Sequence, residues 1–179
     1  MADWTDPDEL DITVGDLPRA AWANAVLDNL RFLYETPALA VRLTSPQTIP
    51  DATDTTIVWS QAVWDSTGQM WDAGAASKIQ IVRAGLYSVS CSLLWDGTAG
   101  DASKRAAFLN VNGTRRRGLQ IPAVNPSEFQ FSADTTLAEG DEIDIEVRQL
   151  SGADLDLLSS GNRTVMTVRW VRALPSTPE

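Results

Sequence analysis

The sequence contains no histidine and only one cysteine, Cys91. Without histidine the chain cannot build a Ser-His-Asp or Cys-His catalytic group, or a metal site with histidine ligands. A single cysteine excludes an intrachain disulfide. No apolar run approaches the roughly 20 residues that a membrane-spanning helix needs, and no apolar segment follows the acidic N-terminus. We therefore expect neither membrane insertion nor a secretory signal.

Basic residues are scarce. The 179 residues include 14 basic and 24 acidic side chains, a net charge of −10. This charge disfavours nucleic acid as a partner, because binding there depends on neutralising phosphates. Residues 1–36 hold eight acids and two bases, a net charge of −6, and the other 143 residues account for only −4. The length and composition predict one globular domain with a short appendage that has a separate role.

The appendage, residues 1–36, divides into an arm and a helix. Residues 1–15 show no hydrophobic period and cannot form a packed unit alone, so we expect an extended arm. Asp16 is a suitable helix cap, Pro18 suits a first helical turn, and Pro37 ends the pattern. The sequence therefore predicts one helix between the arm and residue 37.

The predicted helix is amphipathic. Large apolar side chains recur at steps of three and four residues, which places them in one stripe. They are Trp22, Val26, Leu27, Leu30, Leu33 and Tyr34. Such a stripe must be buried against a partner, and three partners remain open: the chain's own β domain, further copies of the chain, or a larger assembly. Together with Trp4 in the arm, these are the candidate anchoring and assembly residues.

From residue 37 the pattern changes to strands and turns, which assigns 37–173 to a β domain and 174–179 to a tail. Residues 86–95 alternate most clearly, with three serines opposing Tyr87, Val89 and Cys91. The other segments predicted as strands are 38–43, 55–63, 78–82, 106–111, 128–136, 143–147 and 164–172, with a return strand from about 114. No helical period separates these strands. About eight strands of this kind predict an all-β sandwich or jelly roll.

Three features occur in order along the β domain. A strand opens with Gly85-Leu86-Tyr87, a hairpin signal follows at Asn112-Gly113, and a turn follows at Leu137-Ala138-Glu139-Gly140-Asp141. In this order and spacing, residues 38–173 resemble the jelly roll of the tumour necrosis factor and complement globular-head superfamily. The resemblance implies a homotrimer in which three domains pack about an axis and bury apolar side chains near it.

The N-terminal segment resembles a different group of proteins. Trp4-Thr5, Val14-Gly15-Asp16-Leu17-Pro18, Trp22-Ala23-Asn24 and Asp28-Asn29-Leu30-Arg31-Phe32-Leu33 are similar to the leaders of many bacteriophage virion proteins. Those leaders precede a β domain displayed on heads or tails. The resemblance implies a protein of the particle surface, made in the host cytoplasm. Its partners would be its own copies and capsid or tail proteins.

Two groups of residues are candidate contacts with a partner or receptor. Trp64, Trp71 and Trp95 lie near predicted strand ends or loops, where aromatic rings either anchor interfaces or plug the ends of the sandwich. Arg115-Arg116-Arg117 follows the predicted hairpin and would bind a carboxylated sugar, a phosphate or an acidic partner. The interpretation that we favour for these arginines is an exposed sheet edge guarded by charge.

No residue pattern indicates catalysis, a metal or a cofactor. Asp141, Glu142, Asp144 and Glu146 form an acidic run, but their strict alternation favours a solvated strand face over a calcium site. Nothing sets these carboxylates at the separation that a glycosidase requires. The serines of residues 86–95 have no base to activate them. We expect no catalytic residue and no cofactor.

The sequence thus predicts a non-enzymatic structural protein of a bacteriophage particle. It would be a trimeric head decoration or fibre protein, or a tail-associated fibre protein, held to the particle by its arm and helix. The alternative is a module that binds a host-surface glycan or protein. A hydrolase acting on cell-surface polysaccharide is the least favoured function.

Overall fold

The computed structural model describes residues 20–34, 36–96, 104–122 and 127–174. The chain divides into two compact units, Met1–Thr36 and Pro37–Glu179. The first contains α1 (Ala20–Tyr34), where the sequence predicts a helix. The second contains every strand of the described residues and two short 3-10 turns, η2 (Ala73–Ala75) and η3 (Ser160–Asn162). The arm, including Trp4, and residues 175–179 of the tail lie outside the described residues.

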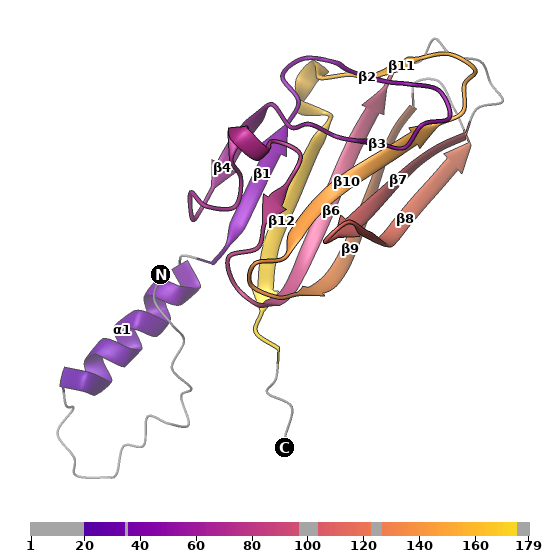
Figure 1. Cartoon of the computed structure of the whole chain (residues 1–179). Coiled ribbons are helices and arrows are strands. Elements are labelled where there is room, and N and C mark those ends of the chain that lie inside the picture. Colours follow the sequence, from indigo (N-terminus) through magenta and orange to yellow (C-terminus); the bar gives the residue numbers. More distant parts are fainter. Residues whose placement is uncertain (1–19, 35, 97–103, 123–126, 175–179) are drawn as a thin grey trace. The chain divides into compact units, whose positions relative to one another are not determined.

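The second unit is a sandwich of two antiparallel sheets (Figure 1). The seven-stranded sheet contains β1 (Ala38–Arg42), β2 (Gln47–Ile49), β4 (Gln61–Asp65), β6 (Gly85–Trp95), β9 (Ser127–Leu137), β11 (Leu155–Leu157) and β12 (Val165–Arg172). The five-stranded sheet contains β3 (Thr55–Thr56), β5 (Ile79–Gln80), β7 (Lys104–Val111), β8 (Thr114–Pro122) and β10 (Glu142–Gln149). This architecture confirms the predicted all-β jelly-roll sandwich.

Strand β6 is the centre of the seven-stranded sheet. It pairs with β9 along its whole length and with β12 on its other side. Tyr87, Val89, Cys91 and Leu93 point into the sandwich and are at most 1% exposed. The serines between them point to the opposite face. The predicted alternation is confirmed, and it gives this sheet one apolar face and one polar face.

The two sheets enclose a single apolar core. Its largest fully buried side chains come from both sheets and from the segments that join them; they include Leu39, Ile57, Trp59, Ile79, Tyr87, Trp95 and Leu109. Cys91 lies within this core, and burial raises the pKa of its thiol above the ordinary value. It is therefore a small buried apolar residue, as the sequence predicts.

Two of the predicted turns support each other. Asn112 and Gly113 have φ values of 50° and 72°, which suits the two-residue hairpin that joins β7 to β8. The Asn112 side chain donates to Asp141 Oδ1 at 2.8 Å and accepts from the Glu142 amide at 2.9 Å. Asp141 Oδ2 in turn accepts the Ala138 amide at 2.8 Å. The hairpin and the turn before β10 are thus joined at one end of the sandwich.

The predicted strand over 55–63 is wrong. This segment forms β3 in one sheet and β4 in the other, because the chain crosses the core between them. The Ile57 amide donates to Ile145 of the five-stranded sheet, and the Ser60 amide donates to Arg42 of the seven-stranded sheet. The sequence also misses β2 and β11, which are three residues each, and most of 78–82 lies outside β5. Strands this short leave little alternation to detect.

Arg105 lies in the core, which the sequence analysis did not foresee. It points inward from β7 and is 1% exposed, and its guanidinium lies 5.6 Å from the centre of the Trp95 ring. Its Nη2 donates to the Asp96 carbonyl at 3.5 Å, while Nε and Nη1 have no partner among the described residues. Burial lowers the pKa of Arg105. Arg105 alternates along β7 with the inward-facing residues Ala107, Leu109 and Val111. The alternation of this strand would therefore have indicated that Arg105 is buried.

We predict that Gly85→Ala destabilises the domain. A Cβ atom at Gly85 would lie 2.3 Å from Trp170 Nε1 and 2.7 Å from the Arg172 carbonyl oxygen, so the β6–β12 pairing must shift. We expect a loss of about 1–3 kcal/mol in the free energy of unfolding, measured by urea denaturation. Gly74→Ala is the matched control, because its Cβ would find the nearest atom at 3.4 Å. Equal effects of the two substitutions would contradict this packing.

A second prediction concerns Tyr87. Its hydroxyl donates to the Arg83 carbonyl at 2.8 Å, and burial raises its pKa to about 12. In a Tyr34→Phe variant Tyr87 is the only tyrosine, and we expect its phenolate absorbance to have a midpoint near 12. Because the folded pKa exceeds the unfolded value, the free energy of unfolding falls as pH rises from about 10 toward 12. A midpoint near the free-tyrosine value in the folded chain would contradict the burial.

Candidate interaction surfaces

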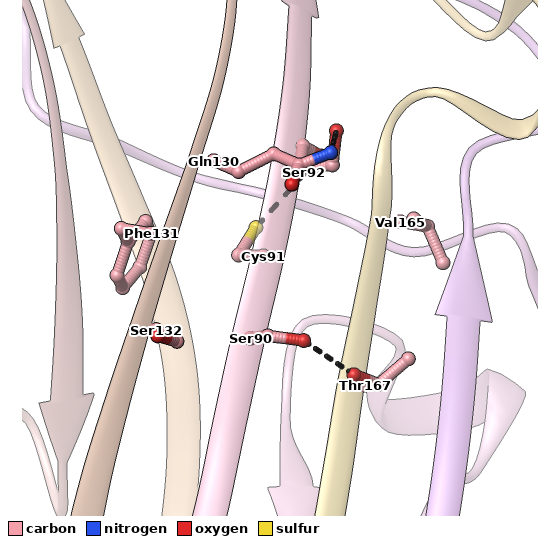
Figure 2. A pocket seen from close by; sticks show the side chains of 8 residues that line it. All are labelled: Ser90, Cys91, Ser92, Gln130, Phe131, Ser132, Val165 and Thr167. Atoms are coloured by element: carbon pink, nitrogen blue, oxygen red, sulfur yellow. Dashed lines mark hydrogen bonds between the residues drawn. The ribbon is translucent and has the colours of Figure 1, made fainter.

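A group of small hydroxyl side chains lies on the outer face of the seven-stranded sheet. We call this the hydroxyl face and define it by Ser88, Ser90, Ser92, Ser132 and Thr167. Ser90 Oγ and Thr167 Oγ1 share a 2.6 Å hydrogen bond between β6 and β12, as Figure 2 shows. A shallow hollow of about 400 Å³ lies here, and its lining side chains carry no formal charge. The hollow offers hydrogen bonds and contact area, and it contains no acid or base for catalysis.

Strand register brings small side chains together at the centre of this face. One row of paired positions runs across five strands, through Trp64, Ala40, Thr167, Ser90 and Ser132. Four of these five side chains are small, so no large side chain rises from this row between β1 and β9. Ala40 is 3% exposed, while the Trp64 ring at the β4 edge is 39% exposed. The row is thus made of small side chains and ends at an exposed aromatic ring.

The loop after Trp64 is held by one carboxylate. Asp65 accepts hydrogen bonds from the amides of Thr67, Gly68, Met70 and Trp71 at 2.9–3.3 Å, and from the Thr67 hydroxyl at 2.9 Å. This fixes the chain from the end of β4 to Trp71. The sequence pointed to the aromatic rings here but not to the acid that positions them.

The three predicted aromatic contacts differ in their surroundings. Trp64 is exposed, and the Arg169 guanidinium lies 5.9 Å from its ring centre. Trp71 is half-buried against the core, and its Nε1 donates to the Ala76 carbonyl at 3.2 Å. Trp95 is fully buried at the end of β6, so its ring presents no surface to a partner. The alternation of β6 continues through its last residue and turns this ring inward, which corrects the expectation of a contact.

Arg115, Arg116 and Arg117 lie on β8, which is an edge strand of its sheet, as the favoured interpretation requires. Arg115 does more than guard the edge. Its Nε donates to Glu146 at 2.7 Å, its Nη2 pairs with Asp54 at 2.7 Å, and its guanidinium lies 4.1 Å from the centre of the Phe108 ring. The bond to Glu146 is the main reason that the pKa of Arg115 is raised. Arg115 is therefore fixed on the outer face of the five-stranded sheet.

The acidic run is divided among separate partners. Lys78 pairs with Glu142 at 3.2 Å and with Asp144 at 3.7 Å, and the bond to Glu142 is the main cause that raises the pKa of Lys78. Asn110 donates to Asp144 at 2.8 Å, and Asp144 is only 4% exposed, so the expectation of a fully solvated face is wrong there. Within the described ranges, no three His, Cys, Asp or Glu side chains come together as a metal site would require.

Helix α1 carries its own exposed apolar surface. Leu27, Leu30 and Leu33, all from the predicted stripe, are 51%, 57% and 60% exposed. Trp22 and Val26 are partly exposed, and the side chain of Tyr34 lies outside the described residues. Phe32, which the stripe omits, is buried. We call the three leucines the leucine face. No described helix is long and apolar enough to cross a membrane.

No protein-family model matches the sequence, and no curated protein sequence matches it either. Solved structures share the fold. Eiger, a tumour necrosis factor of S. frugiperda, is 12% identical with a TM-score of 0.57, over 80% of this chain and 98% of that one. Murine APRIL is 14% identical with a TM-score of 0.56, over 75% and 98%. The globular domain of zebrafish complement 1qA is 12% identical with a TM-score of 0.53, over 77% and 99%. The predicted resemblance of the jelly roll is confirmed at the level of fold.

We predict that Asp65→Ala releases the loop between β4 and Trp71. Because five donors lose one charged acceptor, we expect the free energy of unfolding to fall by about 2–4 kcal/mol. Amide hydrogen exchange at Met70 and Trp71 should accelerate more than exchange in β6. Asp72→Ala is the control, because the Asp72 side chain accepts only from the Gly74 amide in the described structure. Unchanged exchange at Met70 and Trp71 would show that Asp65 does not hold the loop.

Proposed function

We propose that this chain is a non-enzymatic structural protein that assembles as a homotrimer on the surface of a bacteriophage particle. Its N-terminal arm and helix hold it to the particle, and its jelly roll is displayed. The observation that carries the proposal is the leucine face of α1, where Leu27, Leu30 and Leu33 are each more than half exposed. An apolar helix face of this kind calls for a partner, and we assign that role to the particle.

Burial of the leucine face would supply enough free energy to hold the chain to a partner. Complete burial of a leucine side chain contributes roughly 1.5–3 kcal/mol, so three leucines supply several kcal/mol. Trp22 and Val26 extend the stripe, and Trp4 in the arm belongs to the same proposed contact. Three copies of the anchor in one trimer would bind with avidity, since the second and third contacts are made at high effective concentration.

The hydroxyl face supports self-association. Its central row of Ala40, Thr167, Ser90 and Ser132 is small and flat, which allows another sheet or sheet edge to approach closely. The hydroxyl groups can exchange hydrogen bonds with water for hydrogen bonds with a neighbouring copy. The shared fold with tumour necrosis factor and complement 1qA domains favours three copies, in line with the resemblance found in the sequence.

The placement on a phage particle depends on the N-terminal segment. Its motifs resemble virion leaders, and its net charge of −6 sets it apart from the β domain. Capsid or tail proteins would be the partners, and the protein would be made in the host cytoplasm. The net charge of −10 disfavours packaged nucleic acid as the partner. A head decoration or fibre and a tail-associated fibre fit these features equally well.

A host-receptor binding module is the second candidate. The fixed loop after β4 favours it, because Trp64 is exposed beside Arg169 and Asp65 holds the chain that follows. The two functions are compatible, since anchoring uses α1 and recognition would use the β domain. A polysaccharide hydrolase has less support, because the hollow on the hydroxyl face has no paired carboxylates in its lining.

We predict that deletion of residues 1–36 leaves a soluble trimer that no longer joins particles. The leucine face is lost, while the core and the hydroxyl face remain. A Leu27→Gln/Leu30→Gln/Leu33→Gln variant of the full chain should behave in the same way. The measurement is incorporation into purified particles, with the solution mass checked for each protein. If the truncated protein is still incorporated, the anchoring role is wrong.

A further inference from the structure

A basic groove lies on the outer face of the five-stranded sheet. It crosses β10, β7 and β8, has a volume of about 270 Å³, and is lined by Lys104, Phe108, Arg115, Gln120, Arg148 and Leu150, with Ala106 beneath. A second hollow, lined in part by Arg116 and Arg117, continues from it and shares Phe108, Arg115 and Gln120. We call the two together the cationic groove.

The charge of the groove is opposite to that of the protein. Five of the twelve basic residues in 37–179 line it, and the acids paired with them are Asp54 and Glu146, which leaves a local net charge of +3. Lys104, Arg116 and Arg117 are exposed, and none of the ion pairs between described residues involves them. A positive site on a chain of net charge −10 favours a small anionic ligand over a long polyanion, which the rest of the surface would repel.

The floor of the groove is fixed before any ligand binds. Phe108 lies over Gly118, where a Cβ atom would come within 2.4 Å of the ring. The Arg115 guanidinium also lies over this ring, 4.1 Å from its centre, and is held by two carboxylates. Side chains that are already ordered lose little conformational entropy on binding. The side chains that form the floor of the groove are thus held in place for binding, unlike mobile charges on a surface.

Within the first hollow, Lys104 and Arg148 are the charged groups available to an anion besides Arg115, which two carboxylates occupy. Arg148 Nη1 reaches Asp54 at 3.5 Å, and the guanidinium has further N–H donors in the planar arrangement that matches a carboxylate. The Lys104 ammonium adds a second positive charge in the same lining. Gln120 offers both a donor and an acceptor, and Leu150, 43% exposed, provides an apolar wall.

This combination suits an acidic saccharide. A sugar ring that carries a carboxylate presents one anionic group, several hydroxyls and an apolar C–H face, which match Arg148, Gln120 and Leu150 in turn. An acidic peptide would more readily pair with the free edge of β8 through its backbone, whereas the groove crosses the sheet where backbone groups are already paired. We propose that the cationic groove binds a carboxylate-bearing saccharide of one or two rings in contact with the protein. The inference builds on the proposed binding function and does not depend on trimer formation or anchoring.

The test is calorimetric titration of the full chain with three probes. They are a tetrasaccharide that contains glucuronate, a neutral tetrasaccharide of N-acetylglucosamine, and a tetraglutamate peptide. We expect the glucuronate saccharide to bind at least tenfold more tightly than either of the others, and its affinity to fall as salt is raised. Absence of binding, or equal binding of the neutral sugar, would overturn the proposal. Equal or tighter binding of tetraglutamate would assign the groove to an acidic peptide instead.

Variants locate the site. Lys104→Gln/Arg148→Gln should weaken binding of the glucuronate saccharide about tenfold or more, because two charged donors are lost. Arg163→Gln/Arg172→Gln is the matched control, because it removes the same number of positive charges from exposed positions outside the groove. The affinity of this control for the saccharide should stay within twofold of the native value. Arg116→Gln/Arg117→Gln provides a second variant if the first unfolds, as judged by circular dichroism. Equal losses in groove and control variants would show that only overall charge matters.

Failure of this inference is distinguishable from failure of the proposed function. A chain that joins particles but binds no acidic saccharide refutes the groove alone. A chain that binds the saccharide through Arg148 but does not join particles refutes the anchoring role alone.

Discussion

The structure depends on the two-sided alternation of strand β6. Because Tyr87, Val89, Cys91 and Leu93 all point inward, β6 contributes a continuous apolar surface to the core between the two sheets. Its intervening serines point outward and leave a polar face. A shift of one residue in register would turn the apolar side chains of β6 outward and its serines inward. The free energy gained by burying the apolar side chains therefore fixes the register. The paired strands β9 and β12 are thereby fixed, and with them the row that makes the hydroxyl face flat.

Several charged residues of the described structure serve the fold. Asp65 holds a loop, Asp141 closes a turn, and Asp144 is buried beside Asn110. Arg115 is likewise occupied by Glu146 and Asp54. Lys104, Arg116 and Arg117, which belong to none of the ion pairs between described residues, lie in the cationic groove. The leucine face of α1 is exposed and the groove is positively charged, and each is proposed to bind a partner of matching chemistry.

The sequence predicted those features that depend on residues close together in the chain, and it missed those that depend on contacts between distant strands. The alternation of β6, the Asn112-Gly113 hairpin and the turn before β10 are local, so the sequence identified them. The division of 55–63 between two sheets depends on Ile57 and Ser60 bonding to distant strands, which no local pattern reveals. The cationic groove could be predicted only in part. The run of arginines was visible, but Lys104, Phe108 and Arg148 join it through strand pairing that the sequence does not display.

Self-association through the hydroxyl face is the central claim, and the mass of the full chain in solution tests it most directly. Native mass spectrometry should give three times the 19.4 kDa chain mass. Ser90→Arg places a large charged side chain in the middle of the flat row and should give a single folded chain. A monomeric native protein, or a Ser90→Arg variant that remains trimeric, would contradict the account.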